Sequence, residues 1–268
     1  ILMRRPGFQQ RLLLLILPPV LALLVAVVVL AFIATKQRLI DESHNALAVT
    51  ERNLETWLAM RAQRLRESTG VLARDFGFRT AVATDDPATV RSALENLRRR
   101  IAASRLVLLG LDGTVRIDTA AGATQPPPPL PEELDPGQAA AGGAWFAAGH
   151  DGVEQVTVVP VLAPDPVAWV LATSAVTAQD LRAFRRQSTL PVEVSVLHLA
   201  DWSGPSTLDG PGRRALAALV GDPDHADRSE RVPHTVTTGD RTYVALHRYL
   251  PTGAGGPGIV SLVQYSVD

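Results

Sequence analysis

The side chains best suited to metal binding or acid–base chemistry are six histidines, which are scattered along the chain. They are His44, His150, His198, His225, His234 and His247. No pair stands at a spacing typical of metal ligands. His225 and His234 lie in a polar region with Asp222, Asp224 and Asp227, where a cation site and a solvated surface are both open readings; the composition favours the surface. The absence of cysteine excludes disulfides, thiolate metal sites and cysteine nucleophiles. We therefore predict no metal site.

Catalytic motifs are also missing. The sequence contains no Gly-x-Ser-x-Gly nucleophile elbow. The glycine-rich residues 253–257 join two predicted strands and open no helix, so they are not a phosphate-binding loop. A net charge of −1 provides no basic face for nucleic acid. These observations predict a protein that is not an enzyme, with no catalytic residues, no cofactor and no nucleic-acid partner.

Residues 12–35 form an apolar run without a single charged side chain. As a helix they would extend about 36 Å, which is enough to cross a bilayer. Arginines precede the run at residues 4, 5 and 11, so we expect residues 1–11 in the cytoplasm and the bulk of the chain outside, periplasmic or extracellular. A buried soluble helix and a cleaved signal peptide are the alternatives. The length of the run, and the lack of a small-x-small site directly after it, favour an uncleaved anchor in the inner (plasma) membrane.

After this run, residues 36–75 keep a helical rhythm of apolar positions. Heptad steps joined by one step of four connect Ile40, Leu47, Leu54, Leu58, Leu65 and Leu72. One interpretation is an amphipathic helix packed on its own domain. The other is a stalk whose membrane-near half pairs with a second copy, and the two can hold for different halves. We predict a homodimer formed through this helix.

The sequence of residues 76–176 predicts a first module that contains both helix and strands. Asp86 followed by Pro87 is a strong helix start, and an apolar stripe follows at Val90, Leu94, Leu97 and Ile101. Two apolar runs around Asp112-Gly113 predict a β-hairpin. Residues 120–143, rich in Ala, Gly and Pro, predict a loop. Strands are expected again at 152–162 and 167–176, so the order is helix, hairpin, loop, hairpin.

Residues 177–268 predict a second module of similar kind. Thr177 and Asp180 have the spacing of a capping box at the start of a short helix. Strands are expected at 192–199, 231–237, 241–249 and 258–267, with a further helix at 210–220. The fold class is therefore α+β, with an N-terminal transmembrane helix that continues into a long helix and carries two modules with antiparallel sheets.

The order of these elements resembles the double-Cache, PAS-like sensor region of bacterial transmembrane receptors. The local likeness lies in residues 74–83 (RDFGFRTAVA), 86–97 (DPATVRSALENL) and the Leu-Asp-Gly turn at 111–113. Such regions stand ahead of GGDEF diguanylate cyclase or histidine kinase modules. The resemblance implies that 76–176 is membrane-distal, that 177–268 is membrane-proximal, and that ligand or partner binding reaches a cytoplasmic output domain absent from these residues, with cyclic-di-GMP synthesis as its expected activity. The alternative is a membrane-tethered scaffold or protein-interaction domain without a small-molecule ligand.

The resemblance also implies a small-molecule pocket in the first module, with an Arg or Asp holding a charged ligand and aromatic rings giving shape. Arg116 and Asp118 alternate on one predicted strand and so share a face, although they could instead pair with each other. Trp145 and His150 lie in the segment expected to cover the sheet, and Thr157 lies on a later strand. The module has no tyrosine, unlike the Tyr- and Arg-rich signature of amino-acid-binding receptors of this superfamily.

Overall fold

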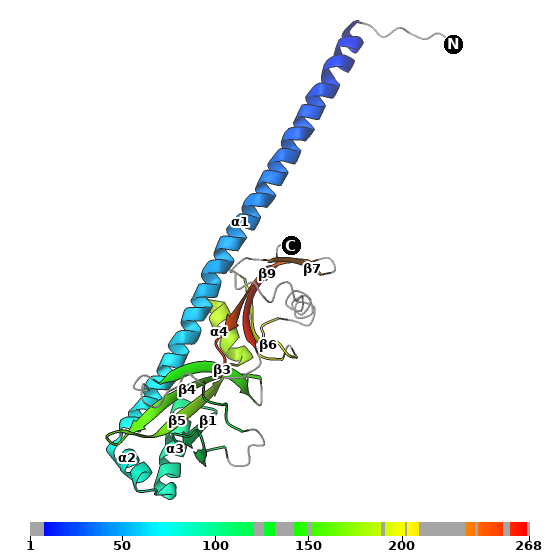
Figure 1. Cartoon of the computed structure of the whole chain (residues 1–268). Helices are drawn as coiled ribbons and strands as arrows, with labels where there is room; N and C mark the ends of the chain where they lie inside the picture. Colours follow the sequence, from blue (N-terminus) through cyan, green and yellow to red (C-terminus); the bar gives the residue numbers. More distant parts are fainter. Residues whose placement is uncertain are drawn as a thin grey trace. The chain divides into compact units, whose positions relative to one another are not determined.

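The computed structural model describes most of the chain (Figure 1). The described residues are 8–120, 126–131, 142–149, 152–188, 191–201, 203–208, 234–238, 241–253 and 258–266. The chain forms two compact units, Ile1–Ala46 and Leu47–Asp268, and each is taken by itself. The predicted helix at 210–220, His150 and His225 lie outside the described residues.

The first unit contains the N-terminal part of helix α1 (Phe8–Arg74). Its side chains are described at 20–31, where the apolar residues are exposed, from Val29 at 49% to Leu23 at 67%. Within the described residues, no helix combines the length and the hydropathy that crossing a bilayer requires. The side chains of 12–19 and 32–35, which complete the predicted span, lie outside the described part.

In the second unit, α1 is followed by α2 (Phe76–Ala83) and α3 (Pro87–Ile101), and an aspartate caps the N-terminus of both α2 and α3. Asp75 accepts a hydrogen bond from the Phe78 amide at 2.8 Å, and Asp86 accepts one from the Thr89 amide at 3.1 Å. These bonds satisfy amide groups that have no partner within the helix, which explains why two short helices follow the long one. The predicted helix start at Asp86-Pro87 is confirmed.

Five antiparallel strands form one sheet, in the order β2-β1-β5-β4-β3. It belongs to the module predicted to be membrane-distal, so we call it the distal sheet and the second sheet the proximal sheet. They are β1 (Arg105–Leu109), β2 (Val115–Asp118), β3 (Gly143–Gly149), β4 (Gly152–Leu162) and β5 (Pro166–Ala175). The predicted hairpin at Asp112-Gly113 joins β1 to β2, and Gly113 has φ +79°, a conformation that glycine adopts without strain.

Strand β3 corrects the expectation that the segment with Trp145 covers the sheet. Trp145 lies opposite Val156 and Phe146 opposite Gln155, so both aromatic residues are part of the edge strand. Antiparallel pairing along its whole length brings this glycine- and alanine-rich run into register with β4, whose residues are mostly buried. Pairing with β4 thus outweighs the low strand propensity of the run itself.

The two faces of the distal sheet support different cores. What we call the helix face carries Leu106, Leu108, Ile117, Val170 and Ala172, which pack with α2, α3 and the Leu65–Ala73 part of α1. What we call the outer face carries Val107, Leu109, Val156, Trp169 and Leu171, with Leu130 packed against them. Strand alternation therefore decides which polar residues share a site.

Four antiparallel strands form the proximal sheet, in the order β6-β9-β8-β7. They are β6 (Glu193–His198), β7 (His234–Thr238), β8 (Arg241–Leu250) and β9 (Ile259–Ser266). Helix α4 (Ala178–Gln187) precedes them and starts with the predicted capping box: Thr177 accepts from the Asp180 amide at 3.1 Å, and Asp180 accepts from the Thr177 amide at 2.9 Å.

Four of the six predicted heptad positions of α1 are buried inside the second unit, and Leu72 is partly buried there; the side chain of Ile40 lies outside the described part. Leu47, Leu54 and Leu58 join the proximal core, whereas Leu65 joins the distal one. Burying each leucine is worth roughly 1.5–3 kcal/mol. Along this part of the helix, the observed arrangement is an amphipathic helix packed on its own domain.

Candidate functional site

Strand β2 places two of the predicted ligand-binding residues on the outer face of the distal sheet. Asp118 lies opposite Val107, an outer-face residue, while Ile117 lies opposite Leu108 on the helix face. Arg116 is exposed and lies at a register shift of the β1–β2 pair, where Ile117 is opposite Leu108 but Val115 is opposite Leu109, so regular alternation does not extend through it. The shared face of Arg116 and Asp118 therefore stays a prediction.

Asp118 pairs with Arg105 across the hairpin. The Arg105 Nε donates to both carboxylate oxygens of Asp118 at 3.0 Å, and its Nη2 donates to Oδ2. Asp118 Oδ1 also accepts from the Ala120 amide at 2.8 Å. The side chains are only 12% and 21% exposed. Among the described contacts, no ion pair joins Asp118 to Arg116, so the reading in which those two pair is replaced by a bidentate bridge to Arg105.

A row of four residues crosses the outer face in register. Trp145 lies opposite Val156, Val156 opposite Thr173, and Thr173 opposite Arg105. Trp145 is 3% exposed and Thr173 is fully buried, yet the indole Nε1 and the Thr173 Oγ1 have no hydrogen-bond partner among the described atoms. Each unsatisfied buried group costs about 1–3 kcal/mol, which a ligand or an ordered water would recover.

Thr157 lies away from this row. It is opposite Ala172, a helix-face residue, and is fully buried. The sheet therefore separates Thr157 from Trp145 and Asp118, and one pocket cannot contain all three. His150, the fifth predicted residue, lies outside the described part of the chain.

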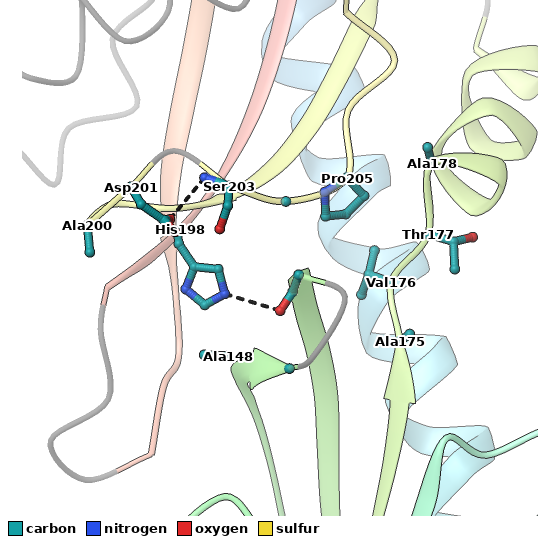
Figure 2. Close-up of a pocket in the computed structure, with 13 residues that line it drawn as sticks. Ala148, Ala175, Val176, Thr177, Ala178, His198, Ala200, Asp201, Ser203 and Pro205 are labelled. Carbon is teal, nitrogen blue, oxygen red and sulfur yellow. Dashed lines mark hydrogen bonds between the residues drawn. The ribbon is translucent and has the colours of Figure 1, made fainter. Parts of the chain in front are cut away.

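A cavity of about 730 Å³ lies between the paired ends of β3 and β4 and the residues that follow β6 (Figure 2). His198 Nε2 is 3.2 Å from the Gly152 carbonyl oxygen, and Asp201 accepts from the Ser203 amide at 3.0 Å. Hydrogen bonds from the Ser203 side chain and amide hold the pKa of Asp201 below 3.8. The rest of the lining consists mainly of small residues and backbone.

Gly204 shapes this cavity through its backbone conformation. The only indication of that conformation in the sequence is that Pro205 follows Gly204. Its φ is +140°, and a Cβ there would lie 2.3 Å from the Val196 carbonyl oxygen. The sequence alone showed His198 only as one of six scattered histidines. Within the described residues, no cluster of three His, Asp or Glu side chains is arranged to hold a metal ion.

The family comparison decides what kind of module this is. A family model described as the double sensory domain of two-component sensor kinases, dCache_3, matches residues 40–204. The chain belongs to this family. A comparison with curated proteins found no matching sequence.

Solved structures share the fold of this dCache_3 chain at low sequence identity. The sensory domain of the Campylobacter jejuni chemoreceptor Tlp3 (CcmL) is 10% identical with a TM-score of 0.51, over 87% of this chain and 96% of that one. The periplasmic domain of Vibrio cholerae LuxQ is 13% identical with a TM-score of 0.50, over 81% and 96%. The double sensory region predicted from the element order is confirmed.

In this dCache_3 chain, Arg61 of α1 contacts both modules, a role that sequence reasoning missed. Its Nη2 donates to the Ser174 hydroxyl at 2.9 Å and to the Ala175 carbonyl at 2.5 Å, at the end of β5. Its Nη1 is 2.9 Å from Asp180 at the start of α4. A single side chain thus connects α1, the last distal strand and the first proximal helix.

Proposed function

We propose that this chain is the extracytoplasmic ligand-sensing region of a membrane-anchored signalling receptor. The observation that carries the proposal is the outer-face row, in which Thr173 lies opposite Arg105 of the Arg105–Asp118 bridge and Trp145 lies at the other end, each with an unsatisfied buried polar atom. An apolar floor with a few convergent polar groups is what small-molecule sites commonly present. The structure of the Tlp3 sensory domain, which has the same fold, has isoleucine bound.

The ligand that fits this face is a small molecule with one charged group. Asp118 would hold a cationic group, or Arg105 an anionic one, when the bridge between them opens to admit it. Arg116 and Trp145, two further residues predicted from the sequence, complete the proposed site. Thr157 is excluded from this site by its place on the helix face.

Membrane attachment is part of the proposal. Residues 12–35, without a charged side chain, would form the single span, with 1–11 in the cytoplasm and the sensory modules periplasmic or extracellular. We place the stalk at 36–75, the distal module at 76–176 and the proximal module at 177–268. Homodimer contacts would lie in the stalk before Leu47, because the later leucines are buried in the chain's own cores.

Signal output is assigned to a cytoplasmic domain outside these residues, and we propose cyclic-di-GMP synthesis as its activity. Ligand binding would act by favouring one packing of the modules on α1 over another. It can do so only by the difference between its affinities for the two arrangements. Because Arg61 touches both modules, we expect its contacts to differ between the two arrangements.

A thermal-shift screen of the whole chain in detergent against small charged metabolites tests the ligand site. A ligand at one hundred times its Kd stabilises the folded state by about 2.7 kcal/mol and raises Tm accordingly. Asp118→Asn, which removes the charge but keeps the shape, should reduce the affinity of a cationic ligand by about tenfold or more. The matched control is Asp85→Asn, at an exposed turn with φ +55° that asparagine also tolerates.

The alternative is a tethered scaffold that binds a protein partner without a small molecule. A screen in which no metabolite raises Tm, or in which Asp118→Asn and Asp85→Asn behave alike, would favour that scaffold over the ligand-binding proposal.

A further inference from the structure

A second cavity, of about 320 Å³, lies against the helix face of the distal sheet. Leu58, Ala59 and Ala62 of α1 form one wall, Phe146 of β3 another, and Leu250 at the end of β8 a third. The Phe146 amide donates to the Pro251 carbonyl at 2.8 Å, which ties the end of β8 to the edge of the distal sheet. The cavity therefore lies at the junction of both modules and α1.

One buried polar residue on the cavity wall has an unused acceptor. Gln155 is 2% exposed, and its Nε2 donates to the Leu58 carbonyl at 2.8 Å, which fixes the orientation of the amide. Its Oε1 has no hydrogen-bond partner among the described atoms. Gln155 lies opposite Phe146 and so faces the same side of the sheet as the cavity. A ligand that donates a hydrogen bond would satisfy this oxygen.

The charged groups at the cavity are already paired. Arg248 Nη1 bonds to Glu55 and lies 3.4 Å from Glu51. Arg66 Nη2 donates to Gln63 Oε1 at 2.5 Å. An uncharged ligand would leave all of these contacts in place.

We propose that this cavity is a binding site for an uncharged amphipathic small molecule, with an apolar body of about one substituted ring and a hydroxyl or amide N–H that donates to Gln155 Oε1. The volume equals that of roughly ten water molecules and lies at the small end of the range for ligand pockets. This site differs from the outer-face site in its hydrogen-bond acceptor, because Gln155 faces the opposite side of the sheet from Asp118; Trp145, on the edge strand, also lines this cavity.

The test uses three probes of one shape and the whole chain in detergent, observed by saturation-transfer NMR titration. The probes are 2-phenylethanol, which has an apolar ring and a donor, ethylbenzene, which lacks the donor, and phenylacetate, which is charged. Loss of the donor leaves Gln155 Oε1 unsatisfied, so ethylbenzene should bind at least about fivefold more weakly than 2-phenylethanol. Phenylacetate should bind more weakly still.

Two alanine variants separate this site from the larger cavity. Ala62→Leu fills the smaller cavity without touching Gln155 and should weaken 2-phenylethanol binding by about tenfold or more. Ala148→Leu, in the larger cavity of Figure 2, is the matched control and should change the affinity for 2-phenylethanol less than twofold. Partition of the probe into detergent is the same for every variant and is subtracted.

The proposal is overturned if 2-phenylethanol shows no saturable binding to the wild-type chain, if Ala62→Leu leaves its affinity unchanged, or if phenylacetate binds as tightly. Circular dichroism of each variant confirms that the fold is retained. None of these outcomes bears on Asp118, so failure here is distinguishable from failure of the proposed ligand-sensing function.

Discussion

At the scale of single residues, two arginines govern how this domain holds together. Arg105 neutralises Asp118 on the outer face, and Arg61 connects α1 to the end of β5 and to the start of α4. Arg61 also lies 5.9 Å from the centre of the Trp57 ring, which further fixes its side chain. Each arginine is mostly shielded from water, so its hydrogen bonds contribute more than those of an exposed ion pair.

Replacing Arg61 by methionine should lower the free energy of unfolding by about 1–3 kcal/mol, because the hydroxyl, carbonyl and carboxylate that it contacts lose a shared donor. Urea denaturation followed by circular dichroism measures the change. Arg52→Met, on an exposed face of the same helix, is the control and should change stability by less than about 0.5 kcal/mol. Equal effects of the two substitutions would contradict the role given to Arg61.

Asp180 predicts how stability depends on pH. Partial burial raises its pKa, but hydrogen bonds from Thr177 and Arg61 outweigh this and hold the pKa below 3.8. A depressed folded-state pKa stabilises the fold above the unfolded value, and this contribution disappears as pH falls through the folded value. Wild type should therefore exceed Asp180→Asn in stability at pH 6, and the difference should shrink below about pH 4. A difference that stays constant from pH 6 to pH 3 would refute this.

At the scale of elements, the sequence predicted those features that local chemistry decides. The helix start at Asp86-Pro87, the capping box at Thr177 and the Asp112-Gly113 hairpin each depend on residues within three or four positions of one another. Such signals can be read without knowing the rest of the fold.

Features set by pairing over longer distances could not be read in this way. Strand β3 forms because β4 pairs with it, although its own residues resemble a loop. The register of the sheet puts Thr157 on the helix face and Trp145 on the outer face, and a shift by one residue would reverse both. The partner of Asp118 is Arg105, thirteen residues away, because the hairpin register brings them together.

The C-terminal end of α3 offers a stability test at this scale. Ala102 ends the helix in the left-handed conformation, with φ +51°, where a Cβ is unfavourable. Ala102→Gly should raise the free energy of unfolding by about 0.5–1 kcal/mol. Ala88→Gly, in the exposed first turn of the same helix, should lower it by a similar amount. Thermal unfolding of both variants checks the opposite signs, and shifts of the same sign would contradict the assignment.

At the scale of the whole second unit, α1 supplies apolar residues to two separate cores. Leu54 packs in the proximal core and Leu65 in the distal core, each against its own sheet. The unit thus consists of two sheets that share one helix. A change in how the helix packs would therefore alter the packing of both sheets. This arrangement is what a sensor needs if binding at one module is to affect the other.

Leucine-to-alanine substitutions should separate the two cores. Leu54→Ala and Leu65→Ala should each cost about 2–5 kcal/mol, since each leaves a cavity in a packed core. Hydrogen exchange measured by mass spectrometry should show faster exchange in β6, β8 and β9 for Leu54→Ala, and in β1 and β5 for Leu65→Ala. Uniform acceleration over both sheets in both variants would contradict the division into two cores.

The most direct test of ligand sensing is a crystal structure of the chain with the strongest ligand from the thermal-shift screen. We predict density for that ligand on the outer face of the distal sheet, within hydrogen-bond distance of Asp118 or Arg105 and in contact with Trp145. Density for the ligand anywhere else, with the Arg105–Asp118 bridge intact and the outer face unchanged, would contradict the proposed sensing site.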